Sequence, residues 1–206
     1  MQILSKEKLV LARETENGLE ALPPNEAKWL NVVQSKFEHK DKKGNWLFVS
    51  RNKDLDKIPK PDAVIIVATI RQDGELFLVL TKEFRIPVGD YEYGFPAGLV
   101  DENELVTNAA VREFKEETGL DLSIKLVSPW ALYSSAGLTD ETVQFVMGTA
   151  SGEISDKYLE SSEDIEVIIA SKEKVQELID SGLPLGAKAW SIMWMFCNNP
   201  ESLSFE

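Results

Sequence analysis

Apolar residues gather into short runs separated by turn residues, a pattern that is typical of β-strands. Residues Ala63 to Ile70 form a continuous apolar run rich in β-branched residues, which predicts a buried strand. Asp73-Gly74 predicts a hairpin turn, with a return strand from Glu75 to Lys82. Similar runs predict further strands at Leu126 to Tyr133, Thr142 to Ala150 and Asp164 to Ala170.

Helices are predicted in the second half of the chain. The first runs from Asn103 to Thr118 and ends at Gly119, a residue suited to the left-handed turn after a helix. Ser171 is the predicted N-cap of a second helix, which stops at Gly182. Because strands and helices do not alternate regularly, the pattern favours an α+β sandwich over a doubly wound parallel sheet. A last amphipathic helix follows Pro184, with apolar positions at Leu185, Ala189, Ile192, Met193 and Phe196.

The first sixty residues resemble a small separate unit. Trp29 to Phe37 and Trp46 to Arg51 predict two short strands around a polar turn at 41–44. Lys57 to Pro61 contains two prolines and predicts a linker. The expected domains are therefore a β unit at 1–60 and a main domain at 61–206. A hairpin alone is unstable unless it packs on something, which favours an exchange of this unit within a dimer.

Composition excludes several classes of protein. A net charge of −13 disfavours binding to nucleic acid. The longest apolar run is too short to cross a bilayer, and the N-terminus has no signal-peptide pattern. A single cysteine, Cys197, excludes an internal disulfide framework, so the cytoplasm is the expected compartment. The single histidine, His39, lies in a polar run and is expected at the surface.

The residues that suggest chemistry are Glu113, Glu116 and Glu117, whose spacing places three carboxylates on one helix face. Such like charges repel one another unless a cation offsets them, and Mg²⁺ prefers oxygen ligands of this kind. Arg112 lies beside them and can hold a glutamate through a paired hydrogen bond. The alternative is a solvated acidic face, which is common in a chain with 35 acidic residues.

The full pattern around these glutamates favours the metal. From Gly98 to Leu120 the sequence resembles the Nudix box, G-x5-E-x7-R-E-U-x-E-E-x-G-U with U apolar, and it matches at every position. Chance would give this pattern roughly once in 10⁸ starting points. The resemblance implies an α/β/α sandwich around a mixed sheet and a Mg²⁺-dependent hydrolase, with Mn²⁺ as a possible substitute. It also implies metal binding by Glu113, Glu116, Glu117 and the carbonyl of Ala97, with Arg112 and Glu104 orienting the glutamates.

Flanking segments are similar to the ADP-ribose pyrophosphatase branch of that family. Lys82 to Gly89 resembles its Q/E-F/Y-R-x-P-x-G segment, and Tyr93 to Gly98 resembles E-x-P-A-G. This branch carries an N-terminal β unit exchanged across a homodimer, and in its animal members two tryptophans stack on the adenine. The implied substrate residues are Trp29, Trp46, Arg51, Arg85 and Gly137.

Each of these substrate residues has a simpler alternative role. Trp29 and Trp46 could be core aromatics of the small unit, because aromatic residues mostly serve burial. Arg85 could be a structural ion-pair residue, although its guanidinium also matches phosphate oxygens. The resemblance further implies a general base in the loop before a strand, at Glu163 or, as second choice, Glu166. The simpler alternative there is a solvated acidic loop.

One departure concerns the substrate. ADP-ribose enzymes usually carry a proline sixteen residues after the box, where this chain has Ala136. The expected reaction is hydrolysis of ADP-ribose to AMP and ribose 5-phosphate. The alternatives are another nucleoside diphosphate-linked substrate, such as GDP-mannose or a dinucleotide, and a regulator that binds without catalysis. Such regulators usually carry a DNA-binding domain and a degraded box, and this box is intact.

Overall fold

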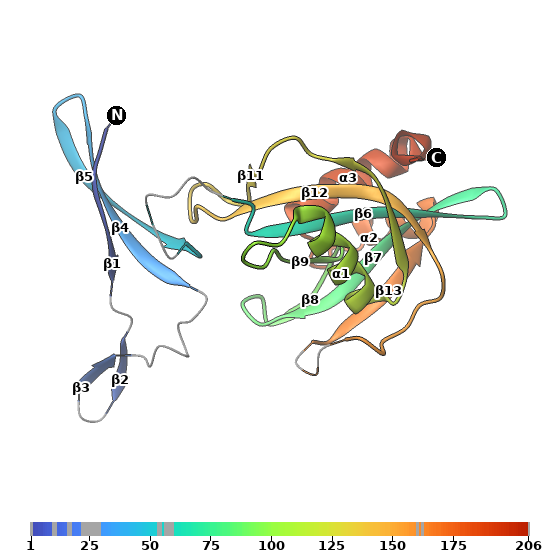
Figure 1. The fold of residues 1–206 in the computed structure, drawn as a ribbon, viewed down its shortest axis with the longest axis horizontal. Coiled ribbons are helices and arrows are strands. Elements are labelled where there is room, and N and C mark those ends of the chain that lie inside the picture. Colours follow the sequence, from blue (N-terminus) through green and yellow to red (C-terminus); the bar gives the residue numbers. More distant parts are fainter. Residues whose placement is uncertain are drawn as a thin grey trace. The chain divides into compact units, whose positions relative to one another are not determined.

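The computed structural model describes residues 2–9, 12–15, 18–21, 30–52, 55, 60–159, 161 and 163–205. Chain contacts divide the protein into two compact units, which are described separately (Figure 1). One unit contains residues 1–62 and 131–143, and the other contains 63–130 and 144–206. Two predicted features, Trp29 and the linker residues 57–59, lie outside the described residues.

The first unit is built on an antiparallel sheet of three strands in the order β1 (Gln2–Leu9), β4 (Asn31–His39) and β5 (Lys42–Ser50). The predicted hairpin is confirmed, but its tip lies at Lys40 (φ 46°) and Asp41 (φ 63°) rather than at 41–44, most of which belongs to β5. Two central residues with positive φ match the right-handed twist of the flanking strands. The exposed position of His39 is also confirmed. The remaining strands of this unit are β2 (Ala12–Thr15), β3 (Gly18–Ala21) and β11 (Leu132–Tyr133).

The second unit is built on a larger mixed sheet. Its path runs β10 (Asp121–Val127), β12 (Thr142–Ser151), β6 (Ala63–Gln72), β7 (Glu75–Arg85) and β13 (Ile165–Ala170). Two shorter strands, β8 (Asp90–Gly94) and β9 (Ala97–Leu99), pair with β7 and β6 respectively. The predicted β6–β7 hairpin is confirmed, with positive φ at Asp73 (50°) and Gly74 (87°).

Helices pack on the two faces of this sheet (Figure 1). On one face, α1 (Val106–Thr118) buries Phe114 against Val64 and Ile66 of β6. On the other face, α2 (Lys172–Asp180) and α3 (Ala187–Asn198) bury a cluster that includes Val67. Alternate residues of β6 therefore serve opposite cores, because strand side chains point to alternating faces. The expected α+β sandwich is confirmed. A short 3-10 helix, η1 (Pro200–Leu203), is the last element of the described chain.

Some predicted elements were wrong in extent. The single strand predicted over Leu126 to Tyr133 is two strands, β10, which begins already at Asp121, and β11, separated at Ser128 to Ala131. Pro129 lies in that interval, and proline has no backbone N–H to donate to a ladder. The first helix begins at Val106 rather than Asn103, whose φ of 69° is not helical. No helix in the described part of the chain is long and apolar enough to span a membrane.

The turn that ends α1 provides a stability test. Gly119 has φ of 73°, and a Cβ there would lie 2.4 Å from the Ser155 backbone nitrogen. Gly182 has the same φ of 73°, with nothing within 4 Å of a Cβ. We expect Gly119→Ala to lower the free energy of unfolding by about 2–4 kcal/mol, and Gly182→Ala by about 1 kcal/mol. Urea unfolding of both variants measures the difference, and equal losses would contradict the close packing at Gly119.

Candidate active site

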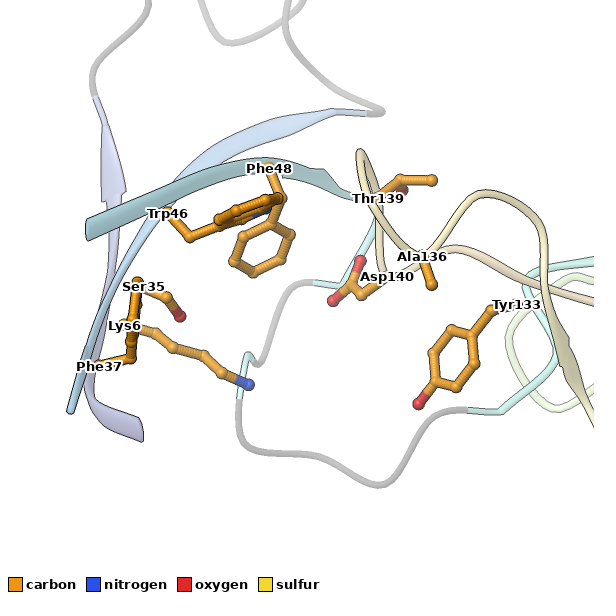
Figure 2. Close-up of a pocket in the computed structure, with 9 residues that line it drawn as sticks. All are labelled: Lys6, Ser35, Phe37, Trp46, Phe48, Tyr133, Ala136, Thr139 and Asp140. Atoms are coloured by element: carbon orange, nitrogen blue, oxygen red, sulfur yellow. The ribbon is translucent and has the colours of Figure 1, made fainter. Parts of the chain in front are cut away.

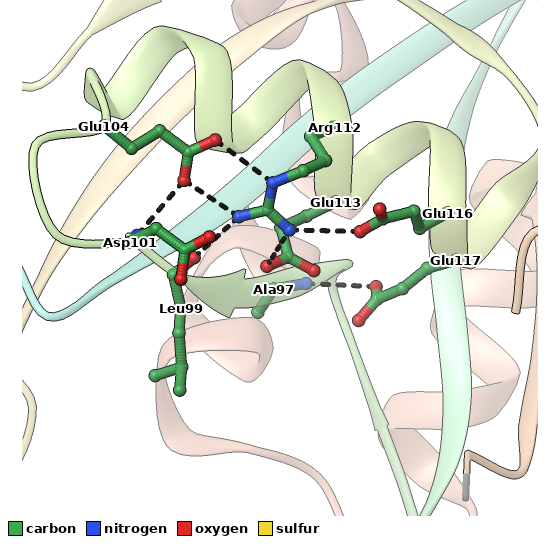
Figure 3. Close-up of polar contacts among 8 residues, drawn as sticks. All are labelled: Ala97, Leu99, Asp101, Glu104, Arg112, Glu113, Glu116 and Glu117. Atoms are coloured by element: carbon green, nitrogen blue, oxygen red, sulfur yellow. Dashed lines mark hydrogen bonds and ion pairs between the residues drawn. The ribbon is translucent and has the colours of Figure 1, made fainter. Parts of the chain in front are cut away.

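The acidic face of α1 lies against β9 (Figure 3). A Cβ on Gly98 would lie 2.0 Å from the carboxyl carbon of Glu113. Only glycine, which has no side chain, therefore allows the helix to bring this carboxylate so close to the strand. The loop between β9 and α1 carries Glu104, whose carboxylate accepts a hydrogen bond from the Asp101 N–H at 3.1 Å. The local structure thus places a strand, a loop and a helix face around one group of charges.

Arg112 holds this group together. Its guanidinium donates to both oxygens of Glu104, at 3.1 and 2.9 Å. It also donates to Glu113 at 2.8 Å, to Glu116 at 3.0 Å and to the carbonyl of Leu99 at 3.0 Å. Hydrogen bonds to these carboxylates raise the pKa of Arg112, and its hydrogen bonds lower the pKa of Glu104. Arg112 therefore fixes the directions of the glutamates that flank it.

Glu117 is the most buried carboxylate of the face, with only 6% of its surface exposed. It accepts a hydrogen bond from the Ala97 N–H at 3.1 Å. Burial raises its pKa well above the ordinary value, and the negative charges of Glu83, Glu113 and Glu163 raise it further. Burial is also the main cause of the raised pKa values of Glu83 and Glu113. Four carboxylates therefore crowd one another in this part of the second unit.

Glu83 is a member of this cluster that sequence reasoning missed as a site residue. Its pKa is raised by burial and, after the opposing effect of Arg85, by the charges of Glu163 and Glu92. The signal was present in the alternation of β7, because Glu83 and Arg85 stand two residues apart and so share one face of the strand. Only the pairing of β7 with β13 brings Glu83 opposite Ile165, close to Glu163.

The donor set fits a divalent cation, because crowded carboxylate oxygens are the ligands that Mg²⁺ prefers and their repulsion requires a compensating charge. In the arrangement described, however, Glu113 and Glu116 turn to Arg112, and Glu117 turns to a backbone N–H. Within the described residues, no three acidic, histidine or cysteine side chains converge on one point as metal ligands do. Binding a cation would therefore require these side chains to rotate from their present partners.

The predicted substrate residues fall into two groups. Arg85 belongs to the second unit and forms ion pairs with Glu83 at 2.7 Å and Glu92 at 3.3 Å. Its side chain is 42% exposed, so these structural pairs leave part of the guanidinium open to solvent. Arg51 belongs to the first unit and donates from Nε to Glu141 at 2.7 Å. Because Glu141 also accepts from Ser134 at 2.7 Å, Arg51 anchors the loop that contains Gly137.

The first unit contains a cavity of about 440 Å³ (Figure 2). Trp46 lies on its wall and is 53% exposed, so it is not a core residue of the unit. Strand pairing places three of the lining residues side by side, because Lys6 pairs with Ser35 and Ser35 pairs with Trp46 across three strands. Its lining residues are Lys6, Ser35, Phe37, Trp46, Phe48, Tyr133, Ala136, Thr139 and Asp140.

Asp140 is the acidic residue of that cavity wall. One carboxylate oxygen accepts hydrogen bonds from Ser50 Oγ at 3.0 Å and Asn52 Nδ2 at 3.3 Å. The other oxygen is buried without a hydrogen-bond partner among the described residues. A buried acceptor without a donor costs free energy. The cavity thus combines aromatic surface with a fixed hydrogen-bond acceptor.

Comparison with known proteins identifies the family. Residues 59–179 match the NUDIX domain, and the chain belongs to this family of hydrolases. Nudix hydrolase 2 of Caenorhabditis elegans is 34% identical over 70% of this chain and 67% of its own length. ADP-ribose pyrophosphatase of Bacillus subtilis is 30% identical over 67% of this chain and 74% of its own length. ADP-sugar pyrophosphatase of Mus musculus is 30% identical over 63% of this chain and 59% of its own length.

A solved structure shows the same fold. The crystal structure of an ADP compounds hydrolase covers 100% of this chain and 96% of its own, with a TM-score of 0.63 and 17% sequence identity. The expected Nudix fold is therefore confirmed. Nudix hydrolases generally use divalent metal ions, in agreement with the carboxylate donors of α1.

The buried carboxylate generates a prediction that does not depend on turnover. Because the pKa of Glu117 is raised in the folded protein, stability falls as pH rises from its ordinary value through the raised one. We expect Glu117→Gln, without divalent metal at pH 8, to raise the melting temperature by roughly 2–4 °C, equivalent to about 1 kcal/mol. At pH 4, where the glutamate is protonated, the gain should disappear.

The same melting curves test whether Mg²⁺ binds at the carboxylate face of α1. Added Mg²⁺ should stabilise the unaltered protein at pH 8 and stabilise Glu117→Gln much less, because binding to the folded state shifts unfolding by mass action. Exposed Glu102 supplies the matched control, since Glu102→Gln removes a nearby charge without touching the helix face. Equal Mg²⁺ responses in all three proteins would show that the cation binds elsewhere.

Proposed function

We propose that this chain hydrolyses the diphosphate of an ADP-sugar, with ADP-ribose as the first substrate and AMP and ribose 5-phosphate as products. The observation that carries the proposal is the carboxylate face of α1, fixed by Arg112 beside Gly98 and crowded by Glu83 and Glu163. The names of the Bacillus subtilis and Mus musculus relatives support the substrate class.

Each residue of the site has a proposed role. Glu113, Glu116, Glu117 and the carbonyl of Ala97 would hold Mg²⁺, or Mn²⁺ in its place. When bound, such a cation neutralises charge on the diphosphate and makes water a better nucleophile. Arg112 and Glu104 orient the glutamates through the hydrogen bonds described above.

Glu163 is the proposed general base. A carboxylate oxygen of Glu163 would accept the proton of the attacking water. Glu163 is close enough to Glu83, Glu113 and Glu117 to influence the pKa of each. Glu166, the second choice from sequence, instead pairs with Lys82 at 3.1 Å and is 65% exposed in its side chain. These contacts support Glu163 over Glu166.

The proposed surface for binding the adenine of the substrate is the cavity of the first unit. Trp46 and Tyr133 offer exposed aromatic rings on which an adenine can stack, and Asp140 lines the same cavity. Arg85 would bind phosphate oxygens through the exposed part of its guanidinium. Arg51 and Gly137 belong to the same substrate surface in this proposal, and Trp29 remains a prediction from sequence.

A homodimer is part of the proposal. The first unit exposes several large apolar side chains, which single soluble chains usually cover by association. These residues are Leu30, Trp46, Leu47, Leu132, Tyr133 and Leu138. A second copy that covers part of these side chains would complete a substrate site from two subunits. We further propose a cytoplasmic location, because one cysteine cannot form a disulfide within the chain.

The second candidate function is hydrolysis of a different nucleoside diphosphate-linked compound, such as GDP-mannose or a dinucleotide. Ala136 favours it, because this residue replaces the proline expected for ADP-ribose and lines the cavity. A regulator that binds without catalysis is less well supported, because the whole carboxylate and arginine network is present.

The products test the proposed reaction. Purified protein with Mg²⁺ should convert ADP-ribose to AMP and ribose 5-phosphate, without release of orthophosphate, because water attacks within the diphosphate. EDTA should abolish turnover, and Glu117→Gln should lower it by several orders of magnitude. Chromatography of products from ADP-ribose, GDP-mannose, a dinucleotide and ATP measures the preference. Faster turnover of ATP, or release of orthophosphate, would contradict the proposal.

The aromatic wall tests substrate binding. Trp46→Ala should raise KM for ADP-ribose about tenfold with little change in kcat, since stacking of about 1.5 kcal/mol acts equally on ground and transition states. Trp194→Ala removes a tryptophan of similar exposure, 51%, from α3; it is the matched control and should leave KM unchanged. Equal effects of the two variants would remove the stacking role.

Light scattering tests the dimer. The chain has a mass of 23.1 kDa, and the proposal requires twice that mass at micromolar concentration. A monomer that still hydrolyses ADP-ribose would exclude the exchanged unit while leaving the reaction intact.

A further inference from the structure

The residue that follows the proposed base is held by a tyrosine from another strand. Tyr91 of β8 donates its hydroxyl hydrogen to Asp164 Oδ2 at 2.5 Å. The Asp164 carbonyl accepts a second hydrogen bond, from the Phe84 N–H of β7 at 3.1 Å. Asp164 directly precedes β13, so it is fixed through its side chain and its backbone where the loop enters the sheet. Glu163 is its immediate neighbour in the chain.

Strand pairing shows why Tyr91 is at the right place. Phe84 of β7 pairs with Tyr91 of β8, and Glu83 of β7 pairs with Ile165 of β13. The tyrosine therefore reaches across the end of β7 to the start of β13. Its ring is itself fixed, because it packs edge-on against Phe84 at 5.4 Å between centroids and lies 4.6 Å from Lys82 Nζ.

The Tyr91 hydroxyl acts as a hydrogen-bond donor at neutral pH. The hydrogen bond to Asp164 is the largest cause of a raised pKa at Tyr91, so the phenol stays protonated. Lys82 also pairs with Glu166, which adds a second tie between β7 and β13 beyond the loop. The charges of Asp164 and Glu166 are compensated by Tyr91 and Lys82, so these residues, unlike the crowded carboxylates, need no cation.

We propose that Tyr91 is a positioning residue that sets the direction of Glu163 through its hydrogen bond to Asp164. This inference rests on the proposed role of Glu163 as general base. Without the tyrosine hydroxyl, Asp164 keeps its backbone hydrogen bond but loses its side-chain anchor, and the peptide that carries Glu163 gains freedom. A base displaced from the attacking water slows the chemical step while the binding of substrate is retained.

Tyr91→Phe tests the inference, because phenylalanine keeps the ring that packs on Phe84. We expect kcat for ADP-ribose to fall about tenfold, with KM within about twofold of the unaltered enzyme. Asp164→Asn keeps an acceptor oxygen for the tyrosine and should retain most of kcat, whereas Asp164→Ala should match Tyr91→Phe. The control is Tyr158→Phe, which removes a hydroxyl from the segment between β12 and β13 that also carries Asp164. It should leave kcat unchanged.

A double-variant cycle separates positioning from a general loss of structure. In a Glu163→Gln background no base remains to be positioned, so adding Tyr91→Phe should cause no further loss of kcat. A tenfold loss in both backgrounds would overturn the positioning role. An unchanged kcat in Tyr91→Phe would overturn it as well, with the proposed function intact. If Glu163→Gln itself kept full activity, the base assigned under the proposed function would be wrong, and the inference would fail with it.

Discussion

The repulsion among carboxylates on one face of α1 is the constraint on which the rest of the structure depends. Glu113, Glu116 and Glu117 would destabilise an isolated helix, because like charges three and four residues apart face one another. The fold offsets that cost with Arg112, which binds two of them, and with the Ala97 N–H, which binds the third. The remaining excess of negative charge is the feature that fits the proposed binding of a divalent cation here. The repulsion at this face lowers the stability of the protein, and the proposed function depends on the same negative charges.

The sandwich makes this arrangement possible. Phe114, on the buried face of α1 next to Glu117, is fully buried against β6, so the helix cannot move away from the sheet to relieve repulsion. Gly98 lets β9 approach the helix until it contacts Glu113. Burial then raises the pKa values of Glu113 and Glu117, and it does the same for Glu83 on β7. The apolar core and the charged site are therefore two faces of one packing arrangement.

The first unit follows a different principle. Its sheet turns aromatic side chains outward around a cavity, and the loop at 134–141 is tied to β5 and the residues after it. Arg51 binds Glu141, and Ser50 binds Asp140. Exposed rings are costly in a free surface, but they suit the recognition of a planar ligand.

The sequence alone determined the family, the acidic helix and the strands β4 to β7, β12 and β13, because these depend on local spacing. The box between Gly98 and Leu120 defines residue identities at fixed intervals, and the apolar run of β6 is visible without any partner. Local sequence patterns did not predict the strands whose existence or extent depends on pairing with a neighbouring strand. Strands β8 and β9 are short, and one strand predicted through Pro129 proved to be two.

Only the tertiary structure decided which distant residues share a site. Glu83 joined the carboxylate cluster because β7 pairs with β13, and Asp140 reached the cavity of Trp46 through hydrogen bonds to Ser50 and Asn52. Spacing along the chain describes which side chains share one helix or strand face. It carries no information on which strands become neighbours, because that choice depends on the burial of apolar surface over the whole fold.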